Sequence, residues 1–184
     1  MKVLVACEFS GIVREAFKKR GHDAWSCDLL DTEIPGNHIK GDVLARLDDG
    51  WDLMIAHPPC TYLAVSGSAW LNSPLYPNRR KDQTKAFEFF MRFANAPVER
   101  ICVENPVSVV SSMWRKPDQI IHPYMFGDEA SKPTCLWLKN LPPLFHLDRP
   151  NLFGDKVTHV GKGEFVTTST GRRGAKWNWW LPPG

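Results

Sequence analysis

Residues 2–20, "KVLVACEFSGIVREAFKKR", contain a strand, a turn and a helix, and they decide the fold class. The first six residues are mostly apolar and rich in valine, which is typical of a buried strand. "EFSGI" predicts a turn, and Gly21 is a suitable end for the helix that follows. One face of that helix is apolar: Ile12, Val13, Ala16 and Phe17. A strand that passes directly into an amphipathic helix is the opening unit of an α/β domain.

Strand-like and helical segments alternate along the rest of the chain. A helix is expected at residues 79–95, and residues 61–78 read as a long loop rich in Ser, Asn and Pro. Further strands are expected in "DAWSC" (23–27), "GNHIKGDV" (36–43), "WDLMIA" (51–56), "ERICV" (99–103) and "TCLWLK" (134–139). This alternation predicts a Rossmann-like α/β fold, with a mainly parallel sheet, helices on both faces and a right-handed first crossover.

Length and composition indicate one globular domain. The chain has 184 residues, of which 43% are hydrophobic and 23% charged, and its formal net charge is +3. Residues 1–150 are expected to form the domain, and residues 151–184 a basic, Trp-rich extension that is not a separate domain. No apolar stretch approaches the roughly 18 residues that span a bilayer. The N-terminus reads as a strand rather than a signal peptide, so the expected location is the cytoplasm, with no membrane partner.

The cysteines predict neither a disulfide framework nor a metal site. There are five, and no two form a CxxC pair. Four lie in or beside apolar strand-like runs and are expected to be small buried residues. Cys60 differs, because in "MIAHPPCTYL" (54–63) it follows a strand end and two prolines that fix the backbone. It is either a nucleophile or a small apolar residue in a turn.

Polar or glycine-containing turns follow five of the expected strands. They begin at Glu8, Asp28, Asp42, His57 and Glu104. In a parallel sheet these turns share one carboxyl edge, where an acid after the second strand accepts hydrogen bonds from ribose hydroxyls. Because neither GxGxxG nor GxxxxGK[ST] occurs, a cofactor without a pyrophosphate is favoured, and S-adenosylmethionine (SAM) fits.

The order F-x-G, strand-two acid, G-D, P-P-C and E-N resembles the cytosine carbon-5 DNA methyltransferase family over roughly residues 3–139. The resemblance implies SAM contacts from Phe9, Ser10, Gly11, Asp28, Leu29, Asp42 and Pro59. It also implies that Cys60 is the nucleophile and that Glu104-Asn105, followed by Pro106 in place of the family's Val, binds the base. "FGDEASKPTCLWL" (126–138) is similar to the family's Y-G-x-P-Q-x-R-x-R motif, with Lys132 at the first Arg and Thr134 in place of the second.

The reaction that the resemblance implies is covalent catalysis on cytosine in DNA. Addition of the Cys60 thiolate to carbon 6 would make carbon 5 nucleophilic, while Glu104 binds N3 and the exocyclic amine. Lys132 either binds a phosphate or the pyrimidine oxygen, or is a solvated loop residue. His57 is expected to be a structural residue that ends a strand. Small proteins encoded by phages and prophages look most similar, which implies a bacterial host cell and a role in evading restriction.

The sequence departs from the family in three places, and these departures leave alternatives open. Val13 and Arg14 stand where a second glycine is expected, only about 45 residues follow Lys139, and the family's last motif has no match. The chain could therefore modify DNA with the help of its basic tail, which holds Trp177, Trp179 and Trp180. It could instead act on a free nucleotide such as dCMP, or bind SAM or nucleic acid without catalysis. An amino-methylating enzyme is a weaker alternative, because "HPPC" has no aromatic residue in the stacking position.

Overall fold

The computed structural model describes residues 1–126, 130–145, 165–167 and 173–175. Its helices are α1 (Ile12–Lys18), α2 (Arg79–Ala94) and α3 (Val110–Met113), with short 3-10 helices at Val43–Arg46, Val65–Trp70 and Pro123–Phe126. Its strands are β1 (Lys2–Ala6), β2 (Asp23–Asp28), β3 (His38–Lys40), β4 (Leu53–Ala56), β5 (Arg100–Pro106), β6 (Gln119–Ile121), β7 (Thr134–Lys139), β8 (Phe165–Thr167) and β9 (Arg173–Ala175).

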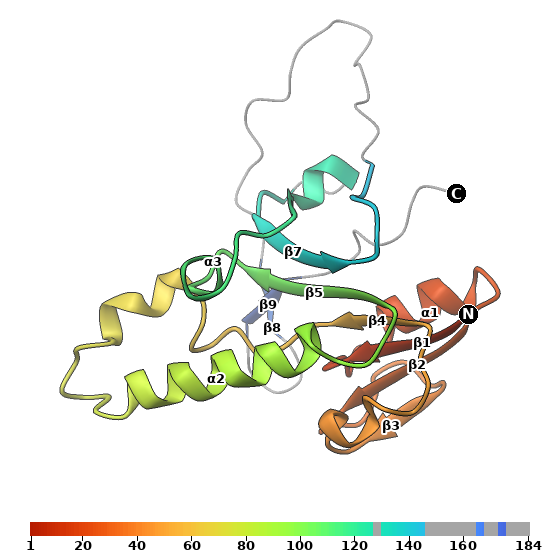
Figure 1. Cartoon of the computed structure of the whole chain (residues 1–184), viewed down its shortest axis with the longest axis horizontal. Coiled ribbons are helices and arrows are strands. Elements are labelled where there is room, and N and C mark those ends of the chain that lie inside the picture. The colour runs from red at the N-terminus through yellow and green to blue at the C-terminus, as the bar shows by residue number, and fades with distance from the viewer. Residues whose placement is uncertain (127–129, 146–164, 168–172, 176–184) are drawn as a thin grey trace, which may run out of the picture.

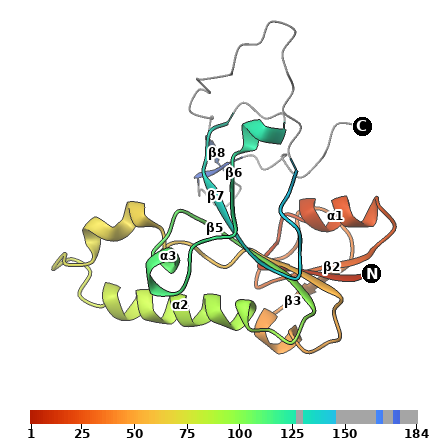
Figure 2. The ribbon, with the colours of Figure 1, turned by 45° about the horizontal axis from the view of Figure 1, so that its top comes forward.

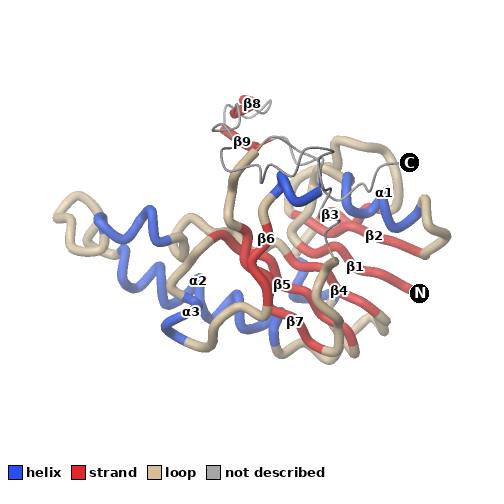
Figure 3. The backbone as a smooth tube through the Cα atoms, turned by 90° about the horizontal axis from the view of Figure 1, so that it is seen from above, coloured by secondary structure: helices blue, strands red, loops and turns tan. Residues whose placement is uncertain are grey.

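Seven of these strands form one sheet in the order β3-β2-β1-β4-β5-β7-β6 (Figures 1 and 3). The pairs from β3 to β5 are all parallel, whereas β7 runs antiparallel to both β5 and β6. The chain reverses its direction of winding at β1, so β1 and β4 flank the position where open α/β sheets bind ligands. The predicted Rossmann-like α/β fold with a mainly parallel sheet is confirmed.

The period-2 alternation of strand side chains builds a core on each face of the sheet. On one face, Leu4 and Met54 join the cluster that contains Phe90 and Phe93 of α2. On the other, Val3 and its neighbours pack with Val13 of α1. The two helices therefore cover opposite faces (Figure 2). Strands with apolar residues on both faces are typical of a buried parallel sheet.

The fifth strand is longer than predicted. The expected strand ended at Val103 with "ENP" as a turn, but β5 continues to Pro106. The antiparallel partner explains the extension, because Glu104 pairs with Leu136 and Pro106 with Thr134 of β7. Glu104 therefore lies near the end of a hydrogen-bonded strand rather than in a loop. The predicted first helix was too long by two residues, and β4 begins at Leu53 rather than at Trp51.

Most of the C-terminal extension lies outside the described residues. This applies to Trp177, Trp179 and Trp180, on which the predicted basic, aromatic tail depends. The described strands β8 and β9 pair with each other in an antiparallel two-stranded sheet. Within the described segments, no helix is both long and apolar enough to cross a membrane.

The core under α2 predicts a large loss of stability on truncation of Phe90. This side chain is fully buried and packs edge-on against Trp137 of β7, with ring centroids 5.2 Å apart. Phe90→Ala should lower the free energy of unfolding by about 3–5 kcal/mol, because it leaves a cavity between helix and sheet. Urea denaturation followed by circular dichroism measures this. Phe145→Ala is the control: Phe145 is 91% exposed, and a loss above about 0.5 kcal/mol there would contradict the assignment of the core.

Candidate active site

The site begins where the parallel strands β4 and β5 end side by side. Ala56 pairs with Val103, so His57 and Glu104 follow at equivalent positions. His57 Nδ1 lies 3.2 Å from Glu104 Oε2, within hydrogen-bond distance. One residue further on, Asn105 Nδ2 donates to the carbonyl oxygen of Pro58 at 2.9 Å. Two side-chain contacts therefore fix the "HPPC" turn to the end of β5.

Cys60 lies at the exposed end of this braced turn. Of the five cysteines, all within described segments, it alone is exposed. Partial burial raises the pKa of the Cys60 thiol, the charge of Lys132 lowers it, and the charge of Glu104 raises it. The same burial effect lowers the pKa of Lys132, against the charges of Glu104 and Cys60. The thiol, the carboxyl and the amine are therefore close enough for each charge to act on the others.

Lys132 and Thr134 reach this site from the segment that leads into β7. Lys132 is half-buried, and the hydroxyl of the fully buried Thr134 donates to the Lys132 carbonyl oxygen at 3.3 Å. Thr134 thus stands where the family pattern has a second arginine, but it holds the backbone rather than offering a charge. Asn105 is also buried, with 1% of its surface exposed, so it contacts the turn and not the open side of the site.

His57 was interpreted from the sequence as a residue that only ends a strand, but the structure gives it a contact with Glu104. Its ring is largely buried, and Nε2 has no hydrogen-bond partner among the described residues. An ionised carboxylate only accepts hydrogen bonds, so this contact requires the tautomer that donates from Nδ1 to Glu104. The sequence position of His57 could have predicted this contact, because residues that directly follow adjacent parallel strands lie side by side.

The acids predicted to bind the cofactor, Asp28 and Asp42, lie at the same edge, further along the sheet. Cys7 directly follows β1 and has a left-handed backbone conformation, with φ 58°. Burial raises the pKa of its thiol, and the charges of Asp28 and Asp42 raise it further, which puts both acids near the end of β1. Each acid also accepts a backbone hydrogen bond within its own turn, from Leu30 N at 3.0 Å and from Leu44 N at 2.9 Å. Each of these bonds involves one carboxylate oxygen.

Glu8 closes the start of α1, a role that sequence reasoning missed. Its carboxylate is 5% exposed and accepts hydrogen bonds from Val13 N at 2.7 Å and Arg14 N at 3.3 Å. Ser10 donates its hydroxyl to the same carboxylate at 3.2 Å. The first amides of the helix are therefore already bound to a negative group of the protein. A phosphate would meet like charge there, so this turn does not suit the pyrophosphate of a dinucleotide.

Arg14 is one of the two residues that stand where the family pattern has a second glycine, and its side chain packs against Gly11. The guanidinium is fully buried and donates to Ser26 Oγ at 3.0 Å and to the Ile34 carbonyl oxygen at 2.6 Å. Gly11 has φ +77°, and a Cβ added to it would lie 2.7 Å from Arg14 Nη2. The glycine is therefore required both by its backbone conformation and by the arginine packed on it.

The remaining predicted cofactor residues lie along this edge with different exposures. Phe9 is half-buried, and its carbonyl oxygen accepts a hydrogen bond from Glu33 N at 2.9 Å. Leu29 follows β2 and is 71% exposed, while Pro59 is exposed beside Cys60. Asp42 is exposed and Asp28 half-buried. The edge therefore presents two carboxylates and apolar surface between the ends of β1, β2 and β3.

The thiol environment predicts a selective and pH-dependent alkylation of Cys60. Iodoacetamide should label Cys60 first, because burial raises the pKa of Cys27 to about 11 and of Cys102 to about 12. Since the Cys60 pKa is itself raised, the labelling rate should climb about tenfold per pH unit up to that pKa. Lys132→Met should slow labelling at fixed pH, because the lysine charge lowers the thiol pKa.

Peptide mapping by mass spectrometry measures the labelled fraction at each time point. Lys116→Met is the matched control, because Lys116 is exposed and is not among the charges that act on the Cys60 thiol. Equal rates for Lys132→Met and the control would contradict the electrostatic coupling between Lys132 and Cys60.

Comparison with family models and with curated protein sequences finds no match. Among solved structures, a similar one belongs to an E. coli protein provisionally named a DNA modification methyltransferase encoded within a prophage. The two chains are 13% identical, with a TM-score of 0.49 over 74% of this chain. The match covers 45% of the E. coli protein, so this chain spans less than half of that structure's length.

Proposed function

We propose that the chain is a SAM-dependent methyltransferase that modifies carbon 5 of cytosine in DNA through a covalent bond to Cys60. One observation carries the proposal: an exposed thiol on a rigid turn shares its electrostatic environment with Glu104 and Lys132. A cysteine that served only as a small apolar residue would not need an acid and a base beside it. Burial raises the pKa of the Cys60 thiol, so the neighbouring Lys132 charge, which lowers it, is the contact that favours the reactive thiolate.

The residues at the neighbouring edge fit SAM. Asp28 and Asp42 supply carboxylates suited to the ribose hydroxyls and the adenine amine, at the end of β1. Glu8 already neutralises the start of α1, which agrees with a cofactor that brings no phosphate. When bound, SAM supplies an electrophilic methyl group. The other predicted contacts, from Phe9, Ser10, Gly11, Leu29 and Pro59, remain part of this proposal.

The side chains of the site have distinct tasks in the proposed reaction. The Cys60 thiolate forms a bond to carbon 6 of the cytosine, which makes carbon 5 nucleophilic. Glu104 shares a proton with N3 and accepts a hydrogen bond from the exocyclic amine, and this proton offsets the negative charge that the thiolate brings onto the ring. After carbon 5 is methylated, its proton is lost to water, the electron pair re-forms the ring double bond, and the Cys60 thiolate departs.

The remaining polar residues position this pair. His57 orients the Glu104 carboxyl through the 3.2 Å contact. Asn105 fixes the Pro58 carbonyl oxygen, and with it the backbone that carries Cys60. Asn105 is therefore a positioning residue in this proposal. Lys132 lowers the thiol pKa and is proposed to bind the pyrimidine oxygen or a phosphate.

Methyl transfer from labelled SAM tests the proposal. The protein is incubated with cytosine-containing DNA in single- and double-stranded form and, separately, with dCMP. Label is expected in DNA as 5-methylcytosine, identified after digestion to nucleosides. Label in dCMP alone would favour the nucleotide-level alternative. If the protein binds SAM and transfers label to neither substrate, it is a binding module and the proposed activity is wrong.

A further inference from the structure

A second concave site lies on the other side of the Cys60 backbone, in the segment between β4 and α2. This segment projects from the end of the sheet together with the start of α2 (Figure 1). It borders an open cavity of about 340 Å³, whose walls include Cys60, Ser66, Gly67, Trp70, Tyr76 and Arg79. This volume falls within the range of sites that bind small organic groups, roughly 300–1,000 Å³.

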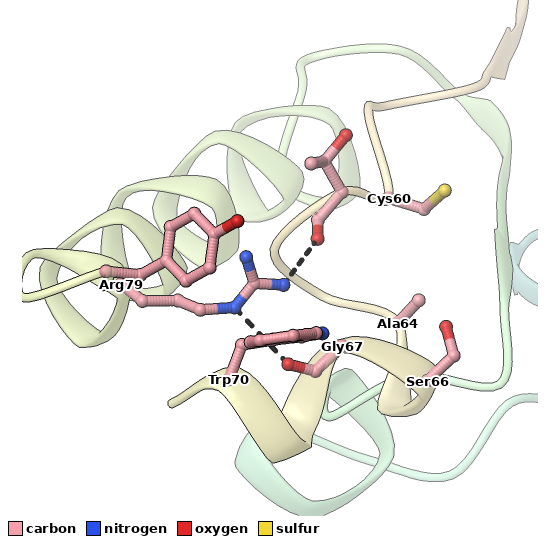
Figure 4. Close-up of a pocket in the computed structure, with 8 residues that line it drawn as sticks. Cys60, Ala64, Ser66, Gly67, Trp70 and Arg79 are labelled. Atoms are coloured by element: carbon pink, nitrogen blue, oxygen red, sulfur yellow. Dashed lines mark hydrogen bonds between the residues drawn. The ribbon is translucent and has the colours of Figure 1, made fainter. Parts of the chain in front are cut away.

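The Arg79 guanidinium is held in place across this cavity. Its Nε donates to the Gly67 carbonyl oxygen at 3.3 Å, and its Nη2 donates to the Thr61 carbonyl oxygen at 3.2 Å (Figure 4). Gly67 permits this approach, because a Cβ at that position would collide with the guanidinium. The planar group is therefore pre-oriented, and these two bonds leave three of its five N–H groups for a ligand.

Aromatic rings stand beside the guanidinium. Trp70 and Tyr76 meet edge to face with centroids 5.6 Å apart, and Arg79 lies 6.0 Å from the Tyr76 centroid. Trp70 is 47% exposed and Tyr76 49% exposed, although both line a cavity. Exposed rings next to an ordered guanidinium plane are surfaces on which nucleobases stack.

The charge around the cavity suits a phosphate backbone. Among the described residues that line it, none is a carboxylate. The first turns of α2 add Arg80, Lys81 and Lys85, all exposed, against the single acid Asp82. A stacking cavity bordered by cations is the arrangement that single-stranded nucleic acid binds.

We propose that this cavity binds the base next to the target cytosine, so that the substrate is a nucleic-acid strand with an unstacked base beside the target rather than a free nucleotide. The identity of the target base rests on the proposed function; the occupant of the cavity rests on the rings, the guanidinium and the charge. Figure 4 shows the Cys60 sulfur pointing away from Arg79. The target and its neighbour would therefore lie on opposite sides of the Cys60 backbone.

Oligonucleotide binding tests this inference without any turnover. Fluorescence anisotropy is measured in a Cys60→Ser background, with a fluorescein-labelled single strand that holds one cytosine. Trp70→Ala should weaken binding about 5- to 100-fold, the effect of losing one stacked base. Trp70→Phe should retain most of the affinity because it keeps a ring. Trp114→Ala is the control, since Trp114 is 38% exposed and does not line the cavity.

A base deletion in the strand places the contact. An abasic site directly 5′ or 3′ of the cytosine should weaken binding to the Trp70-containing protein but add little to the loss in Trp70→Ala. The inference would be overturned if the abasic sites 5′ and 3′ of the cytosine both weakened binding independently of Trp70→Ala. It would also be overturned if Trp70→Ala and its control had equal affinity, or if no strand bound. If the effects of Trp70→Ala and the abasic site are coupled in this way, but the Cys60-containing protein transfers no methyl group, the proposed function is overturned and the inference stands. Methyl transfer by the Cys60-containing protein, with no effect of Trp70→Ala, would do the reverse.

Discussion

Replacing Cys60 with alanine is expected to abolish methyl transfer to DNA, by about 10⁴-fold or more, while the affinity for SAM stays unchanged. The physical reason is that carbon 5 of cytosine is a poor nucleophile until a thiolate has added to carbon 6. Because Cys60 is exposed at the end of a turn, its truncation should also leave the fold intact. Label transfer from SAM and calorimetric titration with SAM measure the two quantities on the same preparation.

The matched control is another cysteine of the chain. Cys102→Ala removes a thiol from the core on the α1 face of the sheet, and it should leave transfer near the level of the unaltered protein. Transfer that survives in Cys60→Ala, or that falls equally in both variants, would show that the thiol is not the nucleophile. The protein would then be a binding module or would use a different chemistry.

Glu104→Gln is expected to lower the turnover number by about 10²- to 10³-fold, with a smaller effect on KM. The amide has the same shape, and its oxygen still accepts a hydrogen bond from His57 Nδ1, so packing is retained. It cannot share an acidic proton with N3, and in the proposed reaction that proton offsets the negative charge that the thiolate brings onto the ring. Steady-state kinetics with single-stranded DNA, together with a thermal denaturation curve, separates this loss from a loss of fold.

His57→Ala discriminates a residue that binds the base from one that positions it. Removing the imidazole frees the Glu104 carboxyl to move but leaves the carboxyl itself in place, so the turnover number should fall less than in Glu104→Gln, by roughly tenfold. His57→Asn, which offers a donor of shorter reach, should recover part of the loss. If Glu104→Gln keeps full activity while His57→Ala does not, the assignment of Glu104 to base binding and of His57 to positioning is wrong.

The alternation of strands and helices was enough to predict the sheet and its active edge. Runs such as "KVLVAC" and "LMIA" are apolar on both faces, which only a covered parallel sheet accommodates, and polar turns then fall at one edge. The short β6 and the extension of β5 could not be predicted in this way. Both depend on β7, whose antiparallel pairing draws Glu104 and Pro106 into a ladder. That pairing joins residues about thirty positions apart and leaves no periodic signal.

The contacts that complete the site could not be predicted from the sequence either. Arg14 reads as a charged helical residue, yet it is fully buried, because Ser26, Thr32 and Ile34 satisfy its N–H groups from other parts of the chain. The cavity beside Cys60 likewise depends on the fold of a segment that looked like an unstructured loop. Gly67 and Arg79 meet there only because the 3-10 helix at Val65–Trp70 turns its backbone toward α2.

A DNA strand that carries 5-fluorocytosine tests the covalent claim most directly. After Cys60 has added and carbon 5 has been methylated, fluorine cannot leave as the proton does, so the bond between Cys60 and carbon 6 should persist. With SAM present, the account predicts a one-to-one complex that survives denaturation, with the added mass on the peptide that contains Cys60. No stable complex from a protein that binds both SAM and the strand, or an equal complex with Cys60→Ala, would contradict it.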